Sequence, residues 1–179
     1  MSAASERASK RASKQASKQP HEQANEAAIE GAVLARMLEA ARAARQHAYA
    51  PYSRFAVGAA LLDEHGRIHT GCNVENAAYP QGVCAEAGAL SALVLAGGRA
   101  VRAVLVLGQS QTAADAPSLP VTPCGGCRQK LREFAADDTP VLTFDMSFQH
   151  QRYTLGELLP ASFGPQHLAA SHPAEKSQP

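Results

Sequence analysis

Cys84-Ala85-Glu86 and Pro123-Cys124-Gly125-Gly126-Cys127 are the two segments around which this sequence is organised. Three cysteines at this spacing offer soft thiolate ligands, which suit zinc. Glu86 stands two residues after the first cysteine, where a carboxylate is able to reach a metal-bound water without replacing it. It is therefore placed to take a proton from that water and deliver it to a leaving group. The two segments predict a zinc ion held by the three cysteines, with Glu86 as the proton shuttle.

Both segments stand at the start of predicted helices, Val83 to Ala96 and Gly125 to Ala136. The N-terminus of a helix carries unpaired N–H groups and partial positive charge, which favour a thiolate over a thiol. Two crossover helices that start at the same edge of a sheet would bring the three sulfurs together. Three protein ligands leave a fourth position open for water, as in catalytic zinc sites.

The spacing leaves other interpretations open. Cys72 is the fourth cysteine of the chain, so a closed structural site with four thiolate ligands fits the count. Cys124 and Cys127 also have the spacing of a redox pair. Glu86 has a simpler explanation too, since the helix dipole favours a glutamate in the first turn.

In the rest of the chain, hydrophobic periodicity predicts an α/β fold. The expected architecture is a three-layer α-β-α sandwich around a mixed sheet of roughly five strands. An antiparallel hairpin comes first and parallel crossovers follow. The residues at 75–82 should form a loop, because proline and glycine there disfavour regular structure. The other predicted elements are a helix at about 22–47, strands at 55–62 and 67–74 with a turn at 63–66, strands at 102–108, 140–144 and 151–154, and a helical turn at 155–159.

The two ends of the chain differ in composition from the rest. Residues 1–21 form an Ala/Ser/Lys-rich basic tail that cannot build a core and is predicted to be disordered. Such a tail is either solubilising or able to touch RNA or an acidic surface. Residues 22–168 are predicted to be one catalytic domain, and residues 169–179 a flexible tail.

Composition narrows the possible partners and location. The net charge is only +1, which gives the whole chain no electrostatic bias toward nucleic acid or an anionic membrane. No apolar run approaches the roughly 18 residues that a membrane span needs. The N-terminus has no hydrophobic segment like that of a secretory signal. We therefore expect a soluble, cytoplasmic protein without nucleic-acid or membrane partners.

Beyond these features, the sequence resembles the small homotetrameric cytidine deaminases, which are zinc enzymes. Six motifs match in order between about Tyr49 and Leu168, and together they are far more specific than Cys-x-x-Cys alone. They are Tyr52-Ser-x-Phe-x-Val-Gly-Ala-Ala-Leu61, Gly71-Cys-Asn-Val-Glu-Asn-Ala77, Tyr79-Pro80, Cys84-Ala-Glu86, Pro123-Cys-Gly-Gly-Cys-Arg-Gln129 and Leu158-Leu-Pro-x-Ser-Phe-Gly-Pro165.

The resemblance implies hydrolytic deamination of cytidine and 2′-deoxycytidine to the uridine forms, with release of ammonia and one zinc per subunit. It implies that Asn73 and Glu75 bind the ribose hydroxyl, since an amide and a carboxylate together satisfy an OH as donor and acceptor. It also implies that Phe55 packs on the pyrimidine ring and that Ala85 offers backbone groups to the base. Alternatively, Asn73 and Glu75 simply face water at a strand end, and Phe55 is a core aromatic.

The resemblance also concerns assembly. In the family, residues at the positions of Tyr79 and Phe163 complete each active site from neighbouring subunits, so a homotetramer is expected. Each of these two side chains fits equally well as an ordinary interface or core aromatic.

The sequence departs from the family pattern directly after Glu86, the predicted proton shuttle. The family usually continues Cys-Ala-Glu-Arg, and that arginine hydrogen-bonds the thiolates, whereas this chain has Ala87-Gly88. Without the arginine, the negative charge of three thiolates makes zinc a poorer Lewis acid. The helix N-termini and Arg128 are expected to compensate for part of this charge. We therefore predict an active enzyme with a raised pH optimum, which is checked by comparing its pH–rate profile with that of an arginine-bearing relative.

The same departure keeps other functions open. Deaminases of cytosine-containing nucleoside antibiotics such as blasticidin S share the zinc motif and also lack that arginine, although Asn73 and Glu75 favour a plain ribose. A polynucleotide deaminase is disfavoured because the domain has no basic patch with interleaved aromatics. A non-catalytic, zinc-stabilised relative is the remaining alternative.

Overall fold

The computed structural model describes residues 20–112 and 120–168, and the side chains from residue 31 onward. The predicted tails at 1–21 and 169–179 therefore lie almost entirely outside the described residues. The chain divides into two compact units, Met1–Ala35 and Arg36–Pro179. Helix α2 (Pro20–Gln46) contributes residues to both units, and every contact discussed below lies within the second.

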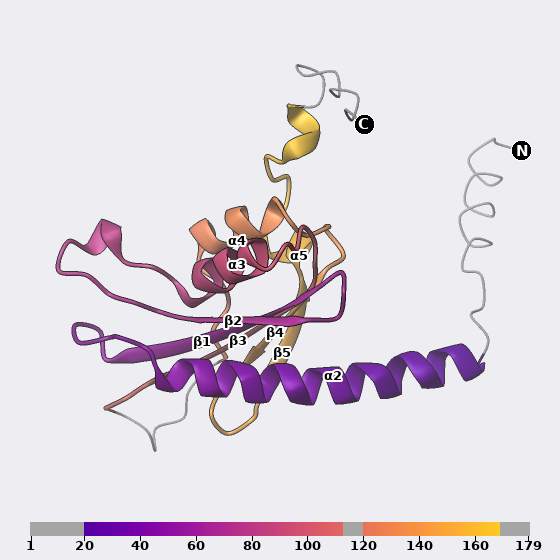
Figure 1. The fold of residues 1–179 in the computed structure, drawn as a ribbon, viewed down its shortest axis with the longest axis horizontal. Helices are drawn as coiled ribbons and strands as arrows, with labels where there is room; N and C mark the ends of the chain where they lie inside the picture. Colours follow the sequence, from indigo (N-terminus) through magenta and orange to yellow (C-terminus); the bar gives the residue numbers. More distant parts are fainter. Residues whose placement is uncertain (1–19, 113–119, 169–179) are drawn as a thin grey trace, which may run out of the picture. The chain divides into compact units, whose positions relative to one another are not determined.

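A five-stranded mixed sheet forms the centre of the second unit, with strand order β2-β1-β3-β4-β5 (Figure 1). The central strand β3 pairs antiparallel with β1 and parallel with β4, while the outer pairs β1–β2 and β4–β5 are antiparallel. This confirms the predicted mixed sheet. The strands are β1 (Phe55–Asp63), β2 (Ile68–Cys72), β3 (Val101–Ser110), β4 (Pro140–Phe144) and β5 (His150–Thr154).

Helices cover both faces of this sheet. On one face, the backbone of α2 near Ala41 and Arg45 lies so close to Gly58 that a Cβ there would come 2.9 Å from the Arg45 Cβ. On the other face, α3 (Ala85–Leu95) packs equally closely on Gly71, and α4 (Gly125–Arg132) lies beside it (Figure 1). The predicted three-layer arrangement is confirmed.

The main core lies between the sheet and the helices α3 and α4. Side chains from β1, β3, β4 and both helices are fully buried there, with Leu61, Leu93, Val104, Leu131 and Val141 at its centre. Strand β3 is buried over most of its length, which agrees with its nearly unbroken apolar sequence. Within the described residues, no helix has the length and hydrophobicity needed to cross a lipid bilayer.

Two predicted elements need correction. Helix α4 ends at Arg132 rather than Ala136, because the backbone N–H groups of Glu133 and Phe134 bond three residues back, to the carbonyls of Lys130 (3.4 Å) and Leu131 (3.0 Å), instead of four. The carbonyl of Phe134 accepts from Val101 N (2.7 Å), and that of Ala135 accepts from Arg132 Nη1 (3.2 Å). The predicted loop at 75–82 contains a single 3₁₀ turn, Tyr79–Gln81, with its proline in the first turn.

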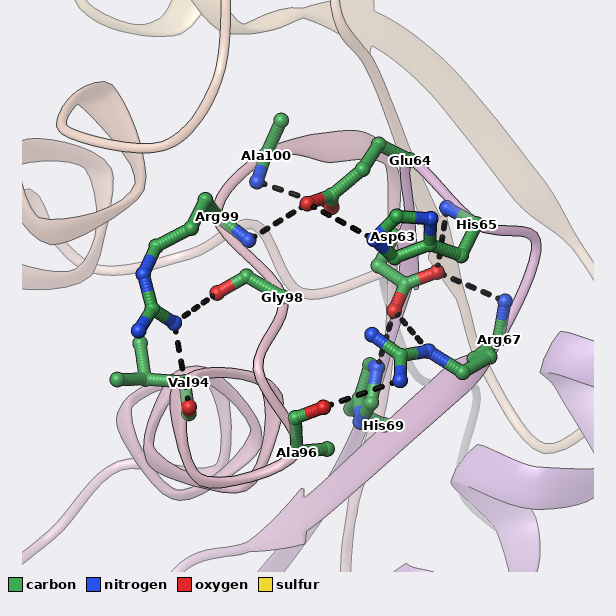
Figure 2. A network of polar contacts seen from close by, with 10 residues as sticks. All are labelled: Asp63, Glu64, His65, Arg67, His69, Val94, Ala96, Gly98, Arg99 and Ala100. Carbon is green, nitrogen blue, oxygen red and sulfur yellow. Dashed lines mark hydrogen bonds and ion pairs between the residues drawn. The ribbon is translucent and has the colours of Figure 1, made fainter. Parts of the chain in front are cut away.

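The β1–β2 turn is joined to the end of α3 by a polar network (Figure 2). Asp63, which is fully buried, accepts from Arg67 Nε (2.7 Å) and His69 Nε2 (2.8 Å) through one oxygen. Arg67 also donates to the carbonyl of Ala96, the C-cap of α3 (3.0 Å). The hairpin thus fixes the C-terminal end of α3, whereas Cys84 lies at its N-terminal end.

The contacts of Asp63 decide its charge. Burial on its own raises the pKa of this carboxyl, but the hydrogen bonds from His69 and Arg67 outweigh burial and hold the pKa well below its usual range. A depressed folded-state pKa means that the charged form stabilises the fold. This stabilisation is complete above the unfolded-state value of about 3.9 and is lost as the pH falls further.

We predict that Asp63→Asn lowers the free energy of unfolding at neutral pH by about 2 to 3 kcal/mol, because it removes a buried charge with two charged or polar partners. Urea unfolding checks this, and the difference from the native chain should shrink as the pH falls below about 4. Glu64→Gln is the matched control. Glu64 is partly exposed, and its two oxygens separately accept from the backbone amides of Arg99 (2.8 Å) and Ala100 (3.0 Å), with His65 Nε2 at 3.5 Å. A glutamine keeps one of these acceptor oxygens, so a smaller loss is expected than for the fully buried Asp63. An equal loss for both variants would contradict the central role of Asp63.

Candidate functional site

Three cysteine sulfurs lie together at the N-termini of α3 and α4. Cys84 is the N-cap of α3, Cys124 is the N-cap of α4, and Cys127 is in the first turn of α4. All three sulfurs lie within 4.8 Å of one another, and the Sγ atoms of Cys84 and Cys124 are 3.8 Å apart. Sulfurs about 2.3 Å from a tetrahedral zinc are themselves ~3.8 Å apart, so this donor set fits zinc. Among the His, Cys, Asp and Glu side chains of residues 20–112 and 120–168, these three cysteines form the group whose ligand atoms lie close enough together to hold a metal ion.

The protonation of the three thiols differs with their surroundings. Burial, followed by the charge of Cys124, raises the pKa of Cys84. Burial and then the neighbouring Glu86 carboxylate raise the pKa of Cys127 far above its usual range. At Cys124, burial is outweighed by hydrogen bonds from the backbone N–H and thiol of Cys127, and the pKa is lowered. A divalent cation is what would stabilise three thiolates here together.

Cys72 is not part of this cluster. It follows Gly71, whose missing Cβ would point into α3, and side chains alternate along a strand. The Cys72 side chain therefore lies on the α2 face of the sheet, opposite the three clustered sulfurs. A closed site with four thiolates is not supported by this arrangement.

Glu86 lies directly beside the sulfurs. It occupies the first turn of α3 and is 5% exposed, and the Cys127 thiol donates to its Oε2 at 3.3 Å. When Cys127 is a thiolate it no longer donates this hydrogen bond, and the Glu86 carboxylate becomes available to another proton donor. Ala85, between Cys84 and Glu86, is buried with its side chain in the core.

The compensation expected from Arg128 does not take the form of a hydrogen bond to a sulfur, because its hydrogen bonds in the described residues go elsewhere. They reach the carbonyls of Pro123 and Leu158 (2.7 Å each) and the Thr122 hydroxyl (3.0 Å). Arg128 thus holds the start of α4 against the C-terminal segment. Ala87, where the arginine was expected, lines an open cavity of about 680 Å³ between α3 and α4.

A second group of candidate residues is brought to the sulfurs by backbone pairing. Val74 and Val83 exchange two hydrogen bonds (2.9 and 2.8 Å) as an antiparallel bridge. In this register Asn73 lies opposite Cys84, and Glu75 lies opposite Gly82. The motif that contains Asn73 and Glu75 is therefore adjacent to the first zinc-ligand candidate.

The side chain of Asn73 is largely occupied by the first strand. Its Oδ1 accepts from Val57 N (2.8 Å) and its Nδ2 donates to the carbonyl of Phe55 (2.9 Å). These two partners fix which end of the amide is oxygen. One N–H of Asn73 remains to donate to a bound molecule. The Phe55 ring is half-buried, and a Cβ at Gly108 would lie 3.0 Å from it.

Glu75 and Tyr79 line one cavity of about 400 Å³. The Oε2 of Glu75 accepts from the backbone N–H groups of Tyr52 (2.9 Å) and Ser53 (3.1 Å). Tyr79 is 77% exposed and lies edge-on to Tyr52, with ring centroids 6.1 Å apart. The remaining lining residues are Tyr52, Ser53, Asn76 and Gly82.

Phe163 does not join that cavity. It is 57% exposed in the C-terminal segment and stacks on His167 with ring centroids 5.0 Å apart. Gln129 Nε2 donates to the Phe163 carbonyl (2.9 Å), and Arg132 Nε donates to the Ser162 hydroxyl (3.0 Å). The helix that bears two of the cysteines therefore holds the segment that presents Phe163.

Sequence reasoning missed Ser53 as part of the site. Ser53 belongs to the same sequence motif as Phe55, which is the one signal in the sequence that it lies near the site. Its spacing from Glu75 gives no indication that the backbone N–H of Ser53 bonds to that carboxylate.

Comparison with known proteins agrees with this geometry. Residues 32–143 match the family described as the cytidine and deoxycytidylate deaminase zinc-binding region. The cytidine deaminase of Sporosarcina psychrophila is 38% identical over 134 residues, which cover 75% of this chain and 93% of that protein. The cytidine deaminase of Mycobacterium tuberculosis is 43% identical over 117 residues, or 65% of this chain and 79% of that protein.

Solved structures give the same result. The crystal structure of cytidine deaminase from Burkholderia pseudomallei has a TM-score of 0.64 and 41% identity, and the match covers 72% of this chain and 97% of that one. The structure from Mycobacterium tuberculosis has a TM-score of 0.60 and 38% identity, and covers 73% and 97%. With its three-cysteine cluster and matching fold, this chain belongs to the cytidine and deoxycytidylate deaminase family.

Proposed function

We propose that this protein deaminates cytidine and 2′-deoxycytidine by hydrolysis, forming uridine and 2′-deoxyuridine and releasing ammonia. The main support is the position of Glu86, a buried carboxylate 3.3 Å from a sulfur of the three-cysteine cluster. A purely structural zinc site has no need of such a group. We assign the reaction to pyrimidine salvage in the cytoplasm.

In this proposal Cys84, Cys124 and Cys127 hold one zinc per subunit. Bound zinc supplies Lewis-acid chemistry that lowers the pKa of a water molecule. Glu86 takes one proton from the attacking water and delivers it to the ring nitrogen N3. It then transfers the remaining hydroxyl proton to the amino group, so that the C4–N bond breaks, ammonia leaves and the C4 carbonyl forms. Positioned proton transfer of this kind contributes about 10²- to 10⁴-fold to a rate.

The other residues bind the nucleoside. The remaining N–H of Asn73 donates to a sugar hydroxyl while the carboxylate of Glu75 accepts from it, which satisfies both sides of the OH group. The ring of Phe55 packs on the pyrimidine, and the backbone of Ala85 contacts the base. Because a site built to bind a hydroxyl is left with unpaired groups by a ligand that lacks it, such ligands are rejected.

We also propose a homotetramer. Tyr79 and Phe163 are aromatic side chains that are more than half exposed in one chain. In an assembly, each would be covered by completing the active site of a neighbouring subunit.

Turnover of cytidine tests the proposed function. Purified protein supplied with zinc should convert cytidine to uridine, seen as an ultraviolet absorbance change, with equimolar release of ammonia. Removal of zinc by a chelator should stop the reaction, and returned zinc should restore it. Conversion of blasticidin S without conversion of cytidine would favour the antibiotic deaminase instead.

Sharing of sites between subunits gives a second prediction. Glu86→Gln and Phe163→Ala should each be inactive or weak alone, but co-expression should restore activity, because some sites then combine an intact Glu86 with an intact Phe163. The measurement is the specific activity of separately purified and co-expressed variants. Activity no higher than the average of the two pure variants would contradict a contribution of Phe163 across subunits.

A further inference from the structure

The segment at 160–163 follows helix α5 (Leu155–Leu158) and ends with the exposed aromatic residue Phe163. Among the described residues, none of its backbone N–H or carbonyl groups pairs with another backbone group. Ala161, within the segment, has a φ of 52°, in the left-handed region that is unfavourable for a residue with a Cβ. Backbone pairing within the segment therefore does not decide where Phe163 lies.

Side chains of α4 hold this segment instead. Gln129 Nε2 donates to the Phe163 carbonyl at 2.9 Å, and Arg132 Nε donates to the Ser162 hydroxyl at 3.0 Å. The Arg132 side chain is only 15% exposed, and its Nη1 also donates to the carbonyl of Ala135 at 3.2 Å, so its own position is fixed. Two consecutive residues of the segment are thus each bound to α4.

The ring of Phe163 is supported by a second contact. It stacks on His167 with ring centroids 5.0 Å apart and an angle of 16° between the planes. The backbone N–H of Gly164, which is buried, donates to His167 Nδ1 at 3.0 Å and fixes the imidazole beside the ring. With its carbonyl bound to Gln129 and its ring stacked on His167, Phe163 presents its exposed surface in one orientation.

Helix α4 therefore takes part in two functional groups of residues. Its N-terminal turn places the sulfurs of Cys124 and Cys127, and Gln129 stands two residues after Cys127. Gln129 is exposed, so it buries little apolar surface, and the hydrogen bond to Phe163 is the contact that it contributes. The helix that orients two zinc-ligand candidates thus also orients the aromatic residue proposed to complete a neighbouring site.

We propose that Gln129 is a positioning residue, whose side-chain amide, together with the Arg132–Ser162 hydrogen bond, holds Phe163 where it completes the active site of a neighbouring subunit. This role of Gln129 rests on the proposed function and deepens it. Gln129 acts through Phe163 rather than on the reacting atoms. Its loss should therefore weaken nucleoside binding, seen mainly in KM, and leave kcat nearly unchanged, because proton transfer by Glu86 is not altered.

The test compares Gln129→Glu with Gln129→Lys. Both variants place a charged side chain of high helix propensity at this exposed position, but only lysine keeps a donor for the Phe163 carbonyl. Gln129→Glu should raise KM for cytidine about three- to tenfold, the range expected for loss of one hydrogen bond. Gln129→Lys should change it less than about twofold, as most surface substitutions do. Equal KM values for the two variants would overturn the proposal.

Ser162 provides an independent comparison at the other hydrogen bond. Ser162→Ala removes the acceptor for Arg132 Nε and should also raise KM for cytidine, whereas Ser162→Thr keeps a hydroxyl and should not. Zinc content and thermal unfolding of all four variants should match those of the native chain. A loss of zinc in Gln129→Glu would instead assign its higher KM to damage in α4 and would contradict a role through Phe163.

A measurement without turnover separates this proposal from the proposed function. The chain has no tryptophan, so Phe163→Trp introduces a single fluorescent reporter at the position in question. Adding Gln129→Glu should lower the emission anisotropy of this tryptophan and increase its quenching by acrylamide, whereas adding Gln129→Lys should change neither. Unchanged anisotropy and quenching would refute the positioning role even in an active enzyme. If the native protein does not deaminate cytidine, the proposed function fails, and the reporter still decides whether Gln129 holds residue 163.

Discussion

Glu86→Gln is expected to abolish deamination while leaving the fold and the bound zinc in place. Glutamine has nearly the same shape, but it cannot carry a proton from water to the departing amine. Loss of this step should lower kcat by about 10²- to 10⁴-fold. Zinc binding should not weaken, because the Glu86 charge is one of the causes that raise the pKa of Cys127, and its removal eases formation of the thiolate.

The measurements are cytidine turnover, zinc content and thermal unfolding of the same preparation. Glu39→Gln is a matched control, since it makes the same chemical change at an exposed position of α2. It should keep full activity. If Glu86→Gln retained its turnover, Glu86 would not be the proton shuttle. If the native chain had no activity to lose, a non-catalytic zinc protein would be favoured.

Much of the fold follows from local sequence patterns. The apolar run Val101–Ser110 is almost entirely buried in the centre of the sheet, as a strand covered on both faces must be. The turn after β1 has its Gly66 at a φ of 77°, which a hairpin turn needs and glycine readily adopts. The cysteines at the starts of α3 and α4 meet because these helices follow β2 and β3, which run in the same direction and end on the same side of the sheet.

The parts that could not be predicted depend on contacts distant in sequence. Nothing near Asn73 in the chain indicates that its amide pairs with the backbone of Phe55 and Val57. The bonds of Arg128 were equally hidden, because one of its partners, Leu158, lies thirty residues away. Residue type alone made Arg128 a candidate neighbour of the thiolates, whereas the fold assigns it to backbone carbonyls.

The consequence of Ala87 remains a prediction. Its side chain lies beside the open cavity between α3 and α4, which Lys130 also lines. No hydrogen bond of Arg128 goes to a sulfur among those found in the described residues. A centre with three thiolates therefore depends on the two helix N-termini for much of its compensation, which keeps the expectation of a raised pH optimum.

Gly71→Ala is expected to damage both the fold and the zinc site, although Gly71 is neither one of the clustered cysteines nor one of the residues proposed to bind the nucleoside. A Cβ at Gly71 would overlap the backbone of α3 at the Ala85 carbonyl and the Ala89 N–H. These are backbone atoms of a regular helix, which cannot move aside singly. We expect a loss of about 3 kcal/mol or more in the free energy of unfolding, at the upper end of overpacking effects.

The zinc site should suffer because the helix turn that is displaced begins directly after Cys84. Gly71→Ala should therefore lose zinc to a chelator at lower concentration than the native protein does, in addition to unfolding at lower urea. Gly88→Ala is the matched control from the other side of the same contact. Its Cβ would lie an ordinary 3.6 Å from Gly71 Cα, and alanine in a helix is favoured over glycine by roughly 0.5 to 1 kcal/mol. Equal stability and zinc retention in the two variants would contradict the close approach of β2 and α3, and with it the way in which this fold positions Cys84.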